Sequence, residues 1–289
     1  MKEKTKQSKK IIRIFAAASF LNDMGSDMIY PVWPLFVTQI LKANMAALGF
    51  LDGLGEALVA ISKALSGYFS DRFKRRKIFI WTGYLLGALS RIGYAFSSAW
   101  THLIPFRIMD RGGKIRGAPR DAFIADISTP KNRGKHFGLI RAMDHLGAVV
   151  GIVICIAFFR ILGYRLLFAL AALPTLISVI LIFLLIKEKK TKKIKLYKGI
   201  SVRDLDKNYK LFLLLSSIFA LGAFSYSFLL IYGSEYGFKT TFIPVLYLVF
   251  TSVAFLFFPY AYLSSDYSSY VCQNITFLFN NFFIRAKKS

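Results

Sequence analysis

The sequence has few cysteines, few acidic residues and a small share of charged residues. Two of its 289 residues are cysteines, Cys155 and Cys272, and neither has the spacing of metal ligands or of a redox pair. Charged residues make up 19%, against about a quarter in an average soluble domain. Lysine and arginine outnumber aspartate and glutamate by 39 to 15, which in a soluble protein would suggest a nucleic-acid partner. Because the basic residues lie in short blocks between apolar runs, we expect no nucleic acid, and no cofactor or metal.

Long apolar runs fill the chain instead. Hydrophobic residues account for 55% of it, and runs of about twenty recur, the length that an α-helix needs to cross the hydrocarbon core. We predict an all-α membrane protein with spans at 13–38, 46–69, 78–98, 100–120, 136–158, 165–186, 211–232 and 241–263. The basic N-terminus resembles a signal peptide, but Arg13 interrupts its apolar core, so an uncleaved first span is expected.

The predicted fourth span is polar, and the argument for it comes from the loops around it. Basic loops face the cytoplasm. The basic blocks at 72–77, 131–135 and 187–198 therefore share one side, which requires two crossings between the first and the second block. Span 78–98 is one crossing, so the segment 100–120 must be the other. This parity places the N-terminus of a multi-pass inner (plasma) membrane protein in the cytoplasm.

Twelve charged residues, six acidic and six basic, fall inside the predicted spans. They are Asp23, Asp27, Asp52, Glu56, Asp110, Asp144, Lys63, Arg91, Arg107, Arg111, Lys114 and Arg141. Each would cost about 2.5–3.5 kcal/mol at the middle of a bilayer, so they must face a water-filled cavity or pair with one another. Helical spacing places them in stripes, one of which holds Asp52, Glu56 and Lys63 on the second span.

Five of these charges are candidates for lining a cavity and for coupling to protons. Asp23 and Asp27 share one face of the first span, and Arg107, Asp110 and Arg111 share one face of the fourth. Two interpretations stay open. The charges either form neutralising pairs that hold helices together, or include a carboxylate that gains and loses a proton as its surroundings change. We also expect Arg107 to lie within reach of Asp23 or Asp27.

The loop between spans two and three points to a family. It reads Gly67-Tyr68-Phe69-Ser70-Asp71-Arg72-Phe73-Lys74-Arg75-Arg76. This resembles the loop signature of the major facilitator superfamily, G-x-x-x-D-R-x-G-R-R, with Lys74 in place of the glycine. Arg107, followed five residues later by Gly112, resembles the family's cavity arginine. The resemblance implies that residues of this loop brace an inner gate, namely Gly67, Asp71, Arg72, Arg75 and Arg76.

Span five carries a second likeness to the family. Gly138, Gly147 and Gly151 have the spacing of its antiporter signature, although Ile152 stands where the signature has proline. Arg141 and Asp144 resemble one prokaryotic permease subgroup, as does the run Pro119-Arg120-Asp121-Ala122. By that comparison the chain is one glycine short between Lys114 and Ile115, which in an α-helix would rotate the later residues by about 100°.

The resemblance also implies a domain organisation. An N-terminal six-helix half covers 1–190, a basic cytoplasmic linker covers 191–210, and two to three helices of an incomplete C-terminal bundle cover 211–289. The loop signature is expected to recur near residue 265, but the sequence around Asp266 has lost its arginines. We therefore expect a truncated chain, inactive by itself and able to self-associate through its unpaired half.

The function expected is transport of a small solute across the lipid bilayer by a secondary carrier, with proton-coupled efflux as one form of it, rather than an enzymatic activity. Two alternatives remain. One is a structural or regulatory membrane fragment. The other is an intramembrane prenyltransferase holding Mg²⁺ and diphosphate on aspartate-rich motifs. Asn22, Asp23 and Asp27 resemble one such motif, but the second candidate, Asp121 with Asp126, has the wrong spacing.

Overall fold

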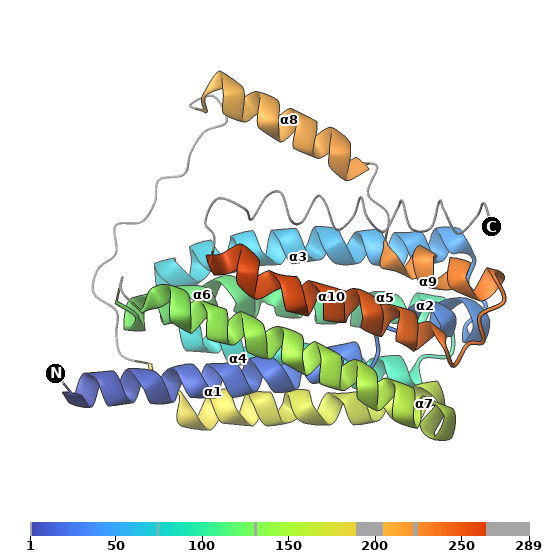
Figure 1. The fold of residues 1–289 in the computed structure, drawn as a ribbon, viewed down its shortest axis with the longest axis horizontal. Helices are drawn as coiled ribbons and strands as arrows, with labels where there is room; N and C mark the ends of the chain where they lie inside the picture. The colour runs from blue at the N-terminus through green and yellow to red at the C-terminus, as the bar shows by residue number, and fades with distance from the viewer. Residues whose placement is uncertain (1, 74, 130–131, 189–204, 222–224, 264–289) are drawn as a thin grey trace.

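The computed structural model describes residues 2–73, 75–129, 132–188, 205–221 and 225–263, and the regular elements in these ranges are helices (Figure 1). They are α1 (Lys2–Asp27), α2 (Trp33–Leu35), α3 (Met45–Phe73), α4 (Arg76–Phe96), α5 (Leu103–Gly112), α6 (Gly117–Ile127), α7 (Arg133–Leu185), α8 (Lys207–Leu221), α9 (Tyr226–Glu235) and α10 (Ile243–Leu263). Most of the predicted linker, and the region around Asp266, lie outside the described residues.

The first predicted span is broken in the structure. α1 ends at Asp27, residues 28–32 form turns, and the helix resumes as α2 and a π-helical stretch, Phe36–Ile40. The prediction of one helix over 13–38 was therefore wrong at its centre. Pro31 and Pro34 explain the break, since a proline lacks a backbone N–H and clashes with the preceding helical turn.

The polar segment predicted as the fourth span is helical. α5, a 3₁₀ stretch (Gly113–Arg116) and α6 follow one another without a gap, and α5 packs against both α3 and α4. The buried residues of α5 include Arg107, Asp110 and Arg111. A hydropathy average misses this helix because its buried face carries charge.

The predicted spans five and six correspond to the two arms of α7. The chain reverses between them at Gly163, whose φ of 65° lies in the left-handed region. Glycine adopts this conformation readily because it has no Cβ. Figure 1 shows the two arms meeting at this reversal.

Two glycines on the first arm of α7 allow α1 to approach closely. A Cβ added at Gly147 would collide with the carbonyl oxygen of Phe20, and one added at Gly151 would collide with that of Met24. A Cβ at Gly138, by contrast, would meet nothing within 4 Å. Two of the three glycines singled out in span five therefore serve the packing of α7 on α1.

The buried apolar side chains form two main clusters with charged residues between them. One cluster includes Ile12 and Phe15 of α1, and the other begins after the end of α1 with Met28 and Ile29. On α1, Asp23 and Asp27 lie between the residues of the two clusters. On α4, Arg91 lies between Tyr84 of the first cluster and Tyr94 of the second. The bundle thus has a charged layer between two apolar ones.

The elements after residue 205 differ in how they contact the bundle. α9 and α10 pack on it through a small cluster of Leu35, Leu230 and Ile243. The ribbon of α8 stands apart from the bundle in Figure 1, and the residues of α8 are exposed. The predicted span 211–232 is divided between α8 and α9. By length and apolar composition, two helices among the described residues, α3 and α7, could cross a membrane.

Candidate functional site

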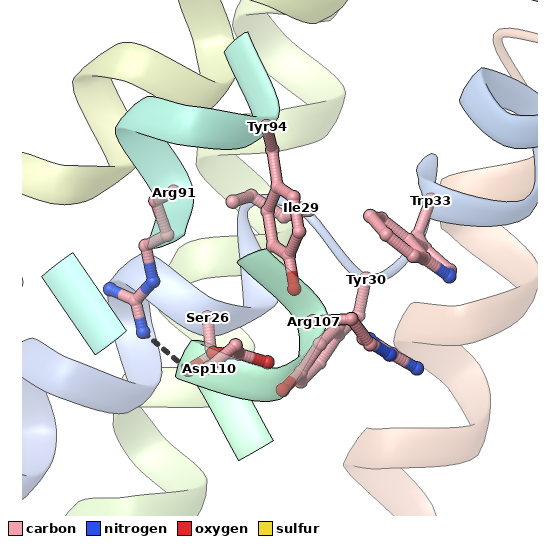
Figure 2. A pocket seen from close by; sticks show the side chains of 8 residues that line it. All are labelled: Ser26, Ile29, Tyr30, Trp33, Arg91, Tyr94, Arg107 and Asp110. Carbon is pink, nitrogen blue, oxygen red and sulfur yellow. Dashed lines mark hydrogen bonds between the residues drawn. The ribbon is translucent and has the colours of Figure 1, made fainter. Parts of the chain in front are cut away.

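A small cavity, with about 10 Å³ of space open to a water-sized molecule, lies in the charged layer. Its walls come from the end of α1 and the turn after it, and from α2, α4 and α5 (Figure 2). The lining residues are Ser26, Ile29, Tyr30, Trp33, Arg91, Tyr94, Arg107 and Asp110. Small-molecule sites usually measure about 300–1,000 Å³, so the cavity is closed to a solute in this structure.

Arg107, like Arg91, is almost completely buried in the lining, with 2% of its surface exposed. Its Nη2 donates to Asp52 Oδ1 at 2.6 Å, and its Nε donates to the Leu51 carbonyl at 3.3 Å. The guanidinium stacks 4.7 Å from the centre of the Trp33 ring. The prediction that Arg107 pairs with Asp23 or Asp27 was therefore wrong, because α5 packs against α3 and presents Arg107 to the carboxylate of that helix.

Asp52 accepts hydrogen bonds from three separate elements. Besides Arg107, the indole of Trp33 donates to it at 3.3 Å, and the hydroxyl of Ser225, the N-cap residue of α9, donates at 2.6 Å. Sequence reasoning placed Asp52 on a polar stripe but did not select it as a site residue. The two other members of that stripe, Glu56 and Lys63, are exposed.

The remaining predicted cavity residues divide into two groups. Asp110 lines the cavity and pairs with Arg111, whose Nε lies 3.5 Å from Asp110 Oδ2 and whose guanidinium stacks on Tyr30 at 5.1 Å. Arg111, Asp23 and Asp27 lie outside the lining. Asp27 accepts a hydrogen bond from Tyr247 of α10 at 3.3 Å, and Asp23 accepts one from its neighbour Asn22 at 2.6 Å.

Arg91 is a site residue that the sequence analysis counted but did not select. It is 2% exposed and, among the described residues, bonds only to uncharged acceptors (Figure 2 shows the contact with Ser26). These acceptors are the carbonyls of Ala171 and Asn22 and the hydroxyls of Thr175 and Ser26. An arginine at the centre of an apolar run was the available signal.

The loop motif forms a separate charge cluster at the ends of α3, α4 and α6. Arg76 is buried and pairs with Asp71 at 3.0 Å and with Asp126. Glu188 accepts from the backbone N–H groups of Arg76 at 2.5 Å and Lys77 at 3.3 Å, so it caps α4. Two other arginines of the motif, Arg72 and Arg75, are exposed, and a Cβ added at Gly67 would make ordinary contact with Ala118.

A second cluster joins α6 to α7. Arg141 pairs with Asp121 at 3.2 Å and Asp144 at 3.3 Å, and Arg120 pairs with the same two carboxylates at 3.2 and 3.5 Å. Arg120 also donates to the hydroxyl of Ser19 on α1 at 2.7 Å. Within the part of the chain that the structure describes, no group of three or more His, Cys, Asp or Glu residues is placed to hold a metal ion.

Comparison with known proteins identifies the family. The sequence profile described as Major Facilitator Superfamily matches residues 15–283. This chain belongs to the major facilitator superfamily. An uncharacterized MFS-type transporter of Methanocaldococcus jannaschii is 34% identical over 237 residues, which are 81% of this chain and 59% of that protein. The chain thus spans less than two thirds of the length of this relative.

Two further likenesses support the same family. Multidrug resistance protein 2 of Bacillus subtilis is 28% identical over 155 residues, which cover 52% of this chain and 38% of that protein. The structure resembles that of a bacterial homologue of the human lysosomal transporter Spinster in an inward-facing, unoccupied conformation. The TM-score is 0.63 at 16% identity, over 91% of this chain and 64% of the other.

Family membership confirms the predicted class of the molecule. It is an all-α membrane protein with a transporter fold, and it belongs with transporters rather than with prenyltransferases or other enzymes. The roles of the cavity, loop and span-five residues stay predictions, as do the orientation of the N-terminus and the inactivity of the chain by itself.

Proposed function

We propose that this protein is a secondary carrier and that its small solute binds in the cavity between α1, α2, α4 and α5. The observation that carries this proposal is the convergence of Arg91, Arg107 and Asp110 on one cavity in the charged layer. Charged groups in a membrane interior are costly, and they are found where they line a pathway or a site. Charge pairing alone would not require a cavity at the place where they meet.

The contacts between the two halves suggest how the cavity opens. The proposed N-terminal half, 1–190, reaches α9 through Asp52 and Ser225, and reaches α10 through Asp27 and Tyr247. Carriers of this family move one half against the other around a central site, so these two hydrogen bonds have to break as the halves separate. The remainder of the proposed organisation is a cytoplasmic linker at 191–210 and a C-terminal half from 211 onward.

Proton-coupled efflux is the form of transport that we favour. A multidrug resistance protein among the relatives supports efflux. Asp27 and Asp52 support proton coupling, because each is a carboxylate, a group that can carry a proton. Each also accepts a hydrogen bond from a hydroxyl group of the other half. The loop cluster around Arg76 would then act as the inner gate.

Water access to the cavity tests the carrier proposal. In a background with Cys155→Ser and Cys272→Ser, Ile29→Cys places a thiol in the lining, while Ala88→Cys places one at a fully buried position outside the lining. We expect an impermeant thiol reagent, applied to sealed vesicles of each orientation, to modify Ile29→Cys and to leave Ala88→Cys unmodified. Equal resistance of the two thiols from both sides would contradict the proposal.

A further inference from the structure

Two arginines of α5 lie side by side in space that a glycine leaves open. Arg107 and Arg111 are four residues apart and share one helix face. A Cβ added at Gly55 of α3 would lie 3.1 Å from Arg107 Nε and 3.3 Å from Arg111 Nε. Two like charges are thus held close together in a region where the exposed fractions are 2% for Arg107 and 8% for Arg111.

Both guanidinium groups retain buried N–H donors without acceptors. Among the described residues, Arg107 Nη1 and Arg111 Nε have no hydrogen-bond partner, although Asp110 Oδ2 lies 3.5 Å from Arg111 Nε as its counter-charge. Leaving a buried donor unsatisfied costs about 1–3 kcal/mol, and more for a charged group. Stacking on Trp33 and Tyr30 covers the faces of the two guanidinium planes, so that bonding is left to their N–H edges.

Basic side chains outnumber acidic ones in the lining of the cavity. Asp52 and Asp110 pair with Arg107 and Arg111, but Arg91, within the described residues, bonds only to uncharged groups. Asp27 and Asp23 lie outside the lining and accept hydrogen bonds from Tyr247 and Asn22. The lining itself therefore carries two guanidinium groups, those of Arg91 and Arg107, against one carboxylate, that of Asp110.

We infer that the solute of this cavity carries an anionic group, a carboxylate on an aromatic or apolar body, bound by Arg107 Nη1 in the lining and by Arg111 Nε next to it. This inference rests on the proposed carrier function. An anion between the two guanidinium groups would satisfy both free donors and offset their mutual repulsion. The rings of Tyr30, Trp33 and Tyr94, all in the lining, would receive the apolar body of the solute.

Three ring compounds that differ in charge test the inference. Benzoate, benzamide and benzylamine share one ring and carry charges of −1, 0 and +1. Trp33 is the reporter, in the full chain with Trp81→Phe and Trp100→Phe, purified in detergent. We expect benzoate to change its fluorescence saturably and the other two compounds to bind at least about tenfold more weakly, as loss of a charge-assisted contact implies.

Variants locate the binding. Arg111→Gln should weaken benzoate binding at least about tenfold, while Arg165→Gln, at an exposed position in the second arm of α7, should not change it. Gly55→Ala keeps both charges and places a methyl group between them, so it should also weaken binding. If Arg111→Gln does not fold, the benzoate affinity of Gly55→Ala tests the inference in its place.

Three results would overturn the inference. The first is that benzylamine binds with the same affinity as benzoate. The second is that both Arg111→Gln and Gly55→Ala bind benzoate as tightly as the parent protein does. The third is that benzoate causes no saturable change in Trp33 fluorescence. Displacement of benzoate by sulfate at similar concentration would overturn the aromatic carboxylate as the preferred group. None of these results contradicts the carrier proposal if the thiol of Ile29→Cys is accessible to water. If that thiol is inaccessible, the carrier proposal is refuted, independently of the result with benzoate.

Discussion

At the scale of single residues, Asp52 connects more elements of the site than any of the five charges selected from the sequence. Its carboxylate accepts from Trp33 after the break in the first span, from Arg107 on α5 and from Ser225 at the start of α9. Hydrogen bonds and a paired charge are what make a buried carboxylate tolerable. Asp52 is therefore expected to stabilise Arg107 and to hold α9 against the bundle.

Replacing Asp52 tests that role. Asp52→Asn would leave the Arg107 guanidinium buried without its counter-charge, which should lower the free energy of unfolding by about 3–5 kcal/mol. Asp121→Asn, in an ion pair that is one third exposed, should cost about 1 kcal/mol or less. Denaturant unfolding of the purified protein in detergent measures both.

A double-variant comparison identifies the partner of Arg107. The damage caused by Arg107→Ala should be partly relieved by Asp52→Asn, because the two then no longer leave one charge unpaired. Asp27→Asn should give no such relief. Relief by Asp27→Asn and none by Asp52→Asn would favour the pairing first expected from the sequence over the pairing in the structure.

At the scale of elements, the 3₁₀ stretch between α5 and α6 has the geometry that would compensate for the one residue that the resemblance to the permease subgroup implies is missing there. A 3₁₀ helix turns by about 120° per residue and an α-helix by about 100°. Over the four residues Gly113–Arg116 the difference amounts to about 80°. This restores most of the rotation of about 100° that one missing residue removes, and so keeps Arg120 facing α7.

Insertion of one glycine tests this compensation. Placed between Lys114 and Ile115, it lets the 3₁₀ stretch relax to α-helix, and we expect the melting temperature to change by less than about 4 °C, or about 1 kcal/mol. Placed between Phe123 and Ile124, where both sides are α-helical, it turns the fully buried Ile124 and the loop partner Asp126 away from their contacts. Equal effects of the two insertions would argue against the compensation.

Helix packing supplies a second prediction at this scale. Gly151→Ala forces a methyl group against the α1 backbone at Met24 and should cost about 1–3 kcal/mol. Gly138→Ala meets open space and should be neutral or stabilising by up to about 1 kcal/mol, since alanine favours the helix. Thermal unfolding in detergent compares the pair, and equal losses would show that close approach is not the reason for Gly151.

At the scale of the whole molecule, the basic residues and the loop cluster gather at one end of the bundle. The exposed Arg72 and Arg75, the buried Arg76 and the exposed Lys135 belong to the loops predicted to face the cytoplasm. The loop at 97–102 lies at the opposite ends of its helices. This distribution is what the positive-inside rule requires of a protein oriented with its N-terminus in the cytoplasm.

Single cysteines test this orientation. Thr101→Cys and Lys135→Cys are both exposed, and each can be placed in the background with Cys155→Ser and Cys272→Ser. An impermeant thiol reagent should modify Thr101→Cys in intact cells, and should reach Lys135→Cys only after permeabilisation. Modification of Lys135→Cys in intact cells would invert the topology.

The sequence alone determined what depends on local composition and on charge between spans. Apolar runs of membrane-spanning length identified the class, and the parity of basic loops found the polar helix at 100–120 that hydropathy misses. The loop from Gly67 to Arg76 indicated the family. Helical spacing correctly placed Arg107, Asp110 and Arg111 on one buried face. These features could be predicted because each depends on residues close together in the chain.

The tertiary structure decided which groups meet. Ser225 reaches Asp52 across 173 residues of chain, and Tyr247 reaches Asp27 across 220. Spacing states which residues share a face of a helix, but the rotation and height of that helix against its neighbours depend on packing. That is why Arg107 was expected beside Asp23 or Asp27 and lies beside Asp52. Packing of α4 on α7, with the Arg91 side chain reaching α1, likewise gave Arg91 its uncharged acceptors, which no local pattern records.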